Sequence, residues 1–223
     1  NAGVFAGSYG QLELSADGGY SYALDNASLA VQSLAAGQVV TETFAYLATD
    51  GIDVTPSTLT VTITGANDTP VVAVPLLNQF ATETGTFTYQ LPIDTFTDID
   101  QGDTLTYAST MADGTALPGW LAFDADTMTF SSSQLSDGTA GLWGVNVTAT
   151  DSLGASVSSA FTLDIANLIT GTNKEDRMRG TGLRDVMYGL RDDDLLRGYA
   201  ADDVLVGGSG NDVLEGGAGN DTL

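Results

Sequence analysis

The sequence is poor in the side chains that carry most enzyme chemistry. Its 223 residues include no cysteine and no histidine, and the six basic residues all lie between Lys174 and Arg197. Ser-His-Asp and Cys-His catalysis and the common zinc sites are therefore excluded. Without a basic patch in residues 1–173 the chain cannot neutralise phosphates, so we expect no nucleic-acid or anionic-membrane partner. No apolar run reaches the roughly 18 residues of a membrane span, and we expect no membrane insertion.

Acidic residues are abundant instead. The chain has 29 of them, 24 Asp and 5 Glu, and a net charge of -23. Two unpaired carboxylates about 4 Å apart repel by roughly 4 kcal/mol at an effective dielectric near 20. A calcium ion turns this repulsion into attraction, and Asp is a short, hard oxygen ligand for it. A halophile's solvating surface would use Glu as freely as Asp, so the composition favours Ca²⁺ as the cofactor.

Residues 1–167 predict two β-sandwiches. Short runs of alternating apolar and polar residues, separated by turn signals such as Asp50-Gly51, are typical of strands with one buried face. In residues 1–69 these runs are 10–14, 20–24, 43–47 and 58–64, and in residues 70–167 they include 87–89, 105–107, 128–130, 145–147 and 161–165. A Gly/Asn/Asp/Pro cluster at 65–70 separates the two groups. We expect no helix before residue 168.

A nine-residue period begins after residue 168. Gly occurs at 171, 180, 189, 198, 207 and 216, Asp five residues after each Gly, and Met or Leu seven residues after each Gly. Gly207-Gly208-Ser209-Gly210-Asn211-Asp212 and the unit that starts at Gly216 match the calcium-binding nonapeptide in full. The first four units hold Lys174, Leu183, Asp192 and Ala201 at the fourth position. Because a non-Gly residue there opposes left-handed backbone geometry, we expect these loops to bind calcium weakly or not at all.

This stretch resembles the RTX (hemolysin-type) calcium-binding repeats. The resemblance implies a truncated parallel β-roll over residues 168–223, with ions between loops of alternate repeats. The metal ligands it implies are Asp194, Asp203, Gly207, Gly210, Asp212, Gly216, Gly219 and Asp221. The alternative is a glycine-turn solenoid that binds no metal.

The two sandwiches also resemble known modules. Residues 1–69, with Gly19-Tyr20-Ser21-Tyr22 and the closing Ile63-Thr64-Gly65-Ala66-Asn67-Asp68, resemble a VCBS-type repeat. Residues 70–167, with Phe96-Thr97-Asp98-Ile99-Asp100 and Ala149-Thr150-Asp151, resemble a dystroglycan-type, cadherin-like domain. This second resemblance implies calcium at the junction, with the ligands Asn67, Asp68, Asp98, Asp100 and Asp151. Gly65 stands where a cadherin linker has a further Asp, so one ion is expected rather than three. Alternatively, Asp98, Asp100 and Asp103 only cap a turn.

Together these features predict an all-β protein of two Ig/cadherin-like β-sandwich modules and a parallel β-roll. They are typical of an internal fragment of a secreted bacterial RTX adhesin, located outside the cell or at its surface, whose partners are calcium ions and neighbouring modules of a longer chain. The absence of Cys fits export through a one-step (type I) secretion channel. The alternative function is a head module that binds a cell-surface glycan or peptide, and a weaker one is an ice-binding roll. We expect no enzyme activity, because Asp124 and Asp126 form a solvated edge and no catalytic module is present.

Overall fold

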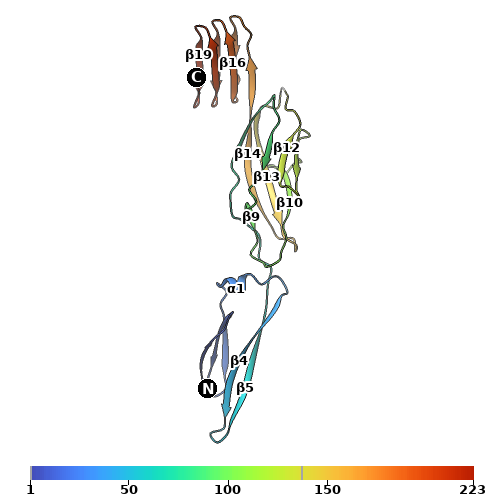
Figure 1. The fold of residues 1–223 in the computed structure, drawn as a ribbon, viewed down its shortest axis with the longest axis vertical. Helices are drawn as coiled ribbons and strands as arrows, with labels where there is room; N and C mark the ends of the chain where they lie inside the picture. The colour runs from blue at the N-terminus through green and yellow to red at the C-terminus, as the bar shows by residue number, and fades with distance from the viewer. Residues whose placement is uncertain (1, 137) are drawn as a thin grey trace. The chain divides into compact units, whose positions relative to one another are not determined.

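The computed structural model describes residues 2–136 and 138–223, and these residues form strands, loops and a single helical turn. They make two compact units (Figure 1). The first comprises residues 2–71, Thr97–Leu105 and Thr150–Ser156, and the second comprises Val72–Phe96, Thr106–Ala149 and Val157–Leu223. Among the described residues, no helix has the length and hydropathy that a membrane crossing requires.

The first unit is a small sandwich of two antiparallel sheets. Strands β1 (Gly3–Ala6), β2 (Gly10–Leu14) and β3 (Tyr20–Leu24) form one sheet, and β4 (Val39–Thr49) and β5 (Val54–Thr64) form a long hairpin. Alternate residues of β2 are buried, as expected for a strand with one face on a core. The ring of Tyr22 on β3 lies 6.2 Å from that of Phe44 on β4, so the two sheets face each other. The core of this unit consists of Leu12, Leu14, Leu34, Phe44 and Ile63.

One element of this unit was not predicted. Helix α1 (Leu29–Gln32) is a single turn, so the expectation of no helix before residue 168 is wrong. Ser28 is its N-cap, and the Ser28 hydroxyl accepts a hydrogen bond from the Val31 backbone N–H at 3.3 Å. A four-residue turn is too short to show helical periodicity, and the capping serine was the only local signal.

The second unit contains a larger sandwich. One sheet has the order β10-β13-β14, with β7 also pairing β14, and the other has the order β11-β12-β8. The rings of Phe130 on β12 and Phe161 on β14 lie 5.3 Å apart at an angle of 72°, which places both sheets on a common core. The strands are β7 (Gln79–Thr82), β8 (Thr88–Gln90), β10 (Thr106–Met111), β11 (Leu121–Asp124), β12 (Thr129–Ser132), β13 (Gly141–Thr150) and β14 (Ser156–Thr170). The short strands β6 (Val71–Val72) and β9 (Phe96–Thr97) lie where the chain passes between the units.

Strand β14 continues from this sandwich into the roll, as Figure 1 shows. Its C-terminal residues pair in parallel with β16, and β16 pairs in parallel with β18. A second parallel sheet has the order β15-β17-β19. Between the sheets lie Met178, Met187, Leu196 and Leu205, flanked by Ile169 and Leu214. The strands are β15 (Arg177–Arg179), β16 (Asp185–Arg191), β17 (Leu195–Ala200), β18 (Val204–Ser209) and β19 (Val213–Ala218).

The nine-residue period explains this architecture. Successive units contribute strands to opposite sheets, so strands paired within one sheet are 18 residues apart, as in Met187 with Leu205 and Leu196 with Leu214. The apolar residue of each unit points inward and fills the narrow core. The predicted all-β class, with Ig/cadherin-like sandwich folds and a parallel β-roll, is confirmed.

Candidate metal sites

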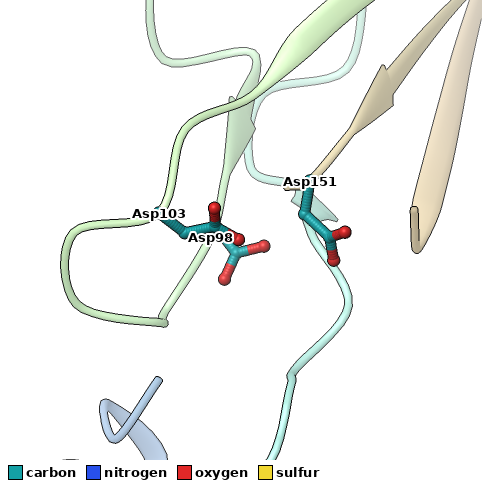
Figure 2. A group of neighbouring side chains, drawn as sticks. All are labelled: Asp98, Asp103 and Asp151. Carbon is teal, nitrogen blue, oxygen red and sulfur yellow. The ribbon is translucent and has the colours of Figure 1, made fainter. Parts of the chain in front are cut away.

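The first candidate site is an acidic group in the first unit, here called the edge cluster. It comprises Asn67, Asp98, Asp100, Asp103 and Asp151, which come from the three chain segments of that unit. Oxygen atoms of Asp98, Asp103 and Asp151 all lie within 4.8 Å of one another (Figure 2). Three carboxylates at this spacing repel strongly unless a cation lies among them.

Hydrogen bonds hold the cluster in shape. Asn67 Nδ2 donates to Asp151 Oδ2 at 2.7 Å, and the Asp68 backbone N–H donates to Asp100 Oδ2 at 2.9 Å. The Asp100 backbone N–H in turn donates to Asp98 Oδ1 at 2.9 Å. The linker that follows β5 is thereby fastened to both acidic segments.

The surroundings favour the ionised form of two of these acids. The Asn67 amide lowers the pKa of Asp151, and the backbone N–H groups of Ala155 and Leu153 contribute to this lowering. Hydrogen bonding from Ser152 and the Thr104 backbone N–H lowers the pKa of Asp103, although the neighbouring Asp151 charge opposes this. Both side chains are therefore ready to bind a cation near neutral pH.

Two oxygens of the cluster have no protein partner. Asp98 Oδ2 and Asp100 Oδ1 are buried and accept no hydrogen bond, and the Asp100 residue is only 5% exposed. A buried, unpartnered carboxylate oxygen is costly. A calcium ion, which takes six to eight oxygen ligands, removes that cost. The residues present therefore fit such an ion.

The structure brings most of the predicted junction residues together. Asn67, Asp98, Asp100 and Asp151 all belong to the cluster, and Asp68 contributes its backbone N–H to Asp100. Asp103 was considered only as a turn residue, but its carboxylate lies in the cluster. Its position five residues after Asp98 matches no simple ligand spacing, so local sequence offers little indication of this role.

The second candidate site is the row of loops along the roll. We number these loops 1 to 6, for residues 171–176, 180–185, 189–194, 198–203, 207–212 and 216–221. Each begins with the periodic Gly and ends with the periodic Asp. A methyl group on Gly207 would lie 2.5 Å from Asp212 Oδ2, and the other five periodic glycines also face the Asp carboxylate of their own loop. The Gly is needed because the Asp side chain folds back across it.

The Asp side chains also link one coil to another. Asp194 Oδ1 accepts the Asp176 backbone N–H at 2.8 Å, and Asp203 Oδ1 accepts that of Asp185 at 2.8 Å. Asp212 and Asp221 accept the backbone N–H groups of Asp194 and Asp203 in the same way, both at 3.0 Å. One carboxylate oxygen of each of these four acids is thus used by the fold, and the other faces its own loop.

Loops 3 to 6 share an unusual backbone. In loops 5 and 6 the positive φ angles fall on Gly208, Gly210, Gly217 and Gly219. Loops 3 and 4 have positive φ angles, between 74° and 84°, at the equivalent positions Leu190, Asp192, Tyr199 and Ala201. The geometry that a non-Gly residue was expected to oppose is therefore present in loops 3 and 4. Lys174 and Leu183 do not adopt it in loops 1 and 2.

Loops 3 and 4 contain unpartnered oxygens like those of the edge cluster. Asp194 Oδ2 and Asp203 Oδ2 are buried and accept no hydrogen bond, and the two residues are 2% and 1% exposed. Burial raises the pKa of Asp203, and the charges of Asp185 and Asp221 add to this, although the Asp185 backbone N–H opposes it. A cation held between loops 3 and 5 and another between loops 4 and 6 would satisfy these oxygens. The residues present fit calcium here too.

Comparison with protein families agrees with this geometry. Residues 170–223 match the RTX calcium-binding nonapeptide repeat. Residues 69–166 match the family model described as "Putative Ig domain". The chain thus contains an Ig-like domain followed by repeats of a calcium-binding type. No curated protein matches the chain significantly.

Similar folds occur among solved structures. Mouse cadherin-23 EC22-24 is 16% identical, with 74% of this chain and 51% of that one covered at a TM-score of 0.47. The protocadherin gamma B4 extracellular domain is 15% identical, with 78% and 31% covered at a TM-score of 0.49. The chain spans about half or less of the length of these two structures.

Proposed function

We propose that this chain is a calcium-dependent segment of a secreted bacterial RTX adhesin. In this proposal the two sandwich modules are extenders that calcium stiffens at the edge cluster, and the roll folds when it binds extracellular calcium. The role is structural rather than catalytic. Recognition of a glycan or peptide by one of the sandwiches stays a prediction.

The unpartnered carboxylates carry this proposal. Among the described residues, four buried carboxylate oxygens accept no hydrogen bond, on Asp98, Asp100, Asp194 and Asp203. All four residues are ligands that the sequence predicts. Solvating acidity would leave its oxygens in water, whereas these oxygens are buried and lack hydrogen-bond donors. The same four atoms are satisfied at once if calcium binds at the edge cluster and in the roll.

A requirement for calcium agrees with a location outside the cell. Proteins with RTX repeats are typically secreted. At the low calcium concentration of a cytosol the acids of loops 3 to 6 would repel one another, and at the millimolar concentration outside a cell, binding would stabilise the folded form. A ligand at about 100 times its dissociation constant adds roughly 2.7 kcal/mol of stability. The acidic residues of loops 3 to 6 thus delay folding of the roll until the chain has been exported.

Calcium titration of the whole chain tests the proposal. Isothermal titration calorimetry should show binding sites in at least two groups, one for the edge cluster and one for the roll. Chelation should lower the melting temperature. The double variant Asp98→Ala, Asp100→Ala should be less rigid than the unmodified chain in small-angle scattering at saturating calcium. Absence of binding heat together with a melt that is insensitive to chelator would refute the calcium role.

A further inference from the structure

The first four periodic Asp residues of the roll fall into two classes. In the first two, Asp176 and Asp185, the Oδ2 atom accepts hydrogen bonds from protein donors. The next two, Asp194 and Asp203, each keep one buried oxygen without a donor. The sequence pattern gives all of them the same role, so this difference arises from their surroundings.

Threonine supplies the donors in the first two loops. Asp176 Oδ2 accepts the Thr172 backbone N–H at 2.6 Å and the Thr172 hydroxyl at 2.9 Å. Asp185 Oδ2 accepts the Thr181 backbone N–H at 2.7 Å and the Thr181 hydroxyl at 3.3 Å. Charge-assisted hydrogen bonds of this kind stabilise a carboxylate without a cation. Loops 3 and 4 have Leu190 and Tyr199 at the same position, and neither side chain donates to the Oδ2 atom of its loop's Asp.

The periodic lattice also extends one unit back into the sandwich. Asn167 lies nine residues before Asp176, and Ile169 lies nine residues before Met178. Asn167 is paired in register with Asp185 in the β14–β16 ladder, and Asn167 Nδ2 donates to Asp185 Oδ1 at 2.7 Å. Strand β14 thus serves as a coil before the first repeat, with an amide where the later coils have a carboxylate.

The formal charge of the roll also differs between its first two loops and the later ones. Residues 171–188 contain four basic and three acidic side chains, whereas residues 189–223 contain two basic and eight acidic ones. The first stretch therefore carries about one positive charge and the second about six negative charges. Net self-repulsion in the absence of a cation is therefore greater in residues 189–223 than in residues 171–188.

Contacts with the sandwich hold the start of the roll as well. Arg184 Nε lies 3.4 Å from Asp164 Oδ2 on β14, and its guanidinium lies 4.9 Å from the centre of the Phe80 ring on β7. The buried Glu83 carboxylate accepts the Leu168 backbone N–H at 3.2 Å. All three are direct contacts between protein groups.

We propose that residues 167–188 are a metal-free start of the roll, which β14 holds in place, and that the requirement for calcium begins at Asp194 and Asp203. This inference rests on the proposed calcium function and refines it. In this start, the hydrogen-bond donors to the periodic carboxylates come from Thr172, Thr181 and Asn167. In loops 3 to 6, calcium takes the place of such donors. The chain then takes up two roll ions, one between loops 3 and 5 and one between loops 4 and 6, and the preformed start is the template on which these loops fold.

Hydrogen exchange of the full chain, with and without chelator, tests this division. In chelator we expect the backbone N–H groups of Thr172, Thr181 and Gly171 to stay protected, because their acceptors are Asp176, Asp185 and Tyr188. Amides of β17, β18 and β19 should exchange at least about tenfold faster than in calcium. Uniform loss of protection over residues 167–223 would overturn the inference while leaving calcium binding intact. Unchanged protection with no binding heat would overturn the proposed function, and this inference with it.

A charge substitution gives a second test. Asn167→Asp places a carboxylate against Asp185, so the start of the roll should lose its protection in chelator and regain it in calcium. Asn173→Asp is the matched control, because Asn173 is an exposed loop residue and receives the same change of charge. Equal exchange in both variants in chelator would contradict the role of the Asn167 amide. Failure of Asn167→Asp to refold in calcium would also count against it, since a cation should then replace the lost donor.

Discussion

Asn67 Nδ2 lies 2.7 Å from Asp151 Oδ2, which joins the linker after β5 to a segment 84 residues further along the chain. This amide is the largest cause of the lowered pKa of Asp151. It holds a buried carboxylate in the ionised form and fixes its orientation toward Asp98 and Asp103. This hydrogen bond therefore ties the linker after β5 to one of the acids of the edge cluster.

Asn67→Ala should weaken calcium binding at the edge cluster by about tenfold or more, because outer contacts that orient a ligand typically contribute 10- to 100-fold. The measurement is calorimetric titration of the whole chain. Asn26→Ala is the control, since Asn26 is an exposed residue of the same unit. Equal affinities in the two variants would show that Asn67 has no part in the site.

Asp103→Asn should reduce calcium affinity at the edge cluster as strongly as Asp98→Asn, because both carboxylates lie within 4.8 Å of Asp151. The matched control is Asp113→Asn. The Asp113 carboxylate accepts the Thr115 backbone N–H at 2.9 Å and its hydroxyl at 2.6 Å, as expected of an exposed turn residue. If Asp103→Asn behaves like Asp113→Asn in the titration, Asp103 only caps a turn.

These two acids show how far the sequence alone could go. Asp103 and Asp113 both precede or follow Gly in turn-like sequence, and local propensity cannot separate a ligand from a turn cap. The difference comes from Asp151, which is distant in sequence and which only the folded chain brings near Asp103. The nonapeptide period, in contrast, predicts the roll from sequence alone, because the positions of its Gly, Asp and apolar residues repeat in six successive units.

Two features of the roll could not be predicted from local sequence preferences. Leu190 and Tyr199 have positive φ angles although neither residue favours them, and each is paired in register with a positive-φ glycine of the next coil, Gly208 or Gly217. A methyl group on either of these glycines would clash with the carbonyl oxygen of Leu190 or Tyr199. The continuation of the lattice into β14 was readable from Asn167, but Thr162 stands where a periodic Gly would have marked it.

Gly198→Ala should destabilise the roll by about 1 to 3 kcal/mol, because its methyl group would clash with Asp203 Oδ2 and lie 2.7 Å from the Gly216 carbonyl oxygen. Gly182→Ala is the matched control. It lies in the same roll, and a methyl group there meets nothing within 4 Å. We expect it to be neutral or to stabilise by about 0.4 to 1 kcal/mol. Urea unfolding in saturating calcium measures both variants, and similar midpoints would contradict the packing of Asp203 over Gly198.

Ala201→Gly should stabilise loop 4 by about 0.5 to 1 kcal/mol. Ala201 has a φ of 75°, and the strain that this causes in a non-Gly residue exceeds the entropic cost of Gly. Ala200→Gly is the control, because Ala200 lies on β17 and gains only the entropic cost. Thermal melts in calcium should move in opposite directions for the two variants. A lower melting temperature for Ala201→Gly would show that the loop is not strained at this position.

Tyr22 makes the first unit sensitive to alkaline pH. Burial raises the pKa of the Tyr22 hydroxyl above its ordinary value of 10.0, and its hydrogen bond to Glu42, 2.6 Å long, and the Glu42 charge raise it further. Because the folded-state pKa is the higher one, the resulting stability is complete below pH 10 and decreases as the pH rises through the folded-state value. The Glu42 carboxylate also accepts the backbone N–H groups of Ser8 and Tyr9, so this hydroxyl completes a buried network.

Tyr22→Phe should lower the stability of the first unit at pH 7 by about 1 to 3 kcal/mol, because the buried Glu42 carboxylate loses a donor. The variant should also lose part of the decrease in stability above pH 10, since the group that titrates is gone. Denaturant unfolding at pH 7 and at pH 10.5 to 11.5 measures both effects. Tyr20→Phe on the same strand is the control, because its side chain is 63% exposed. An alkaline profile that Tyr22→Phe leaves unchanged would show that the Tyr22–Glu42 pair does not control stability in this range.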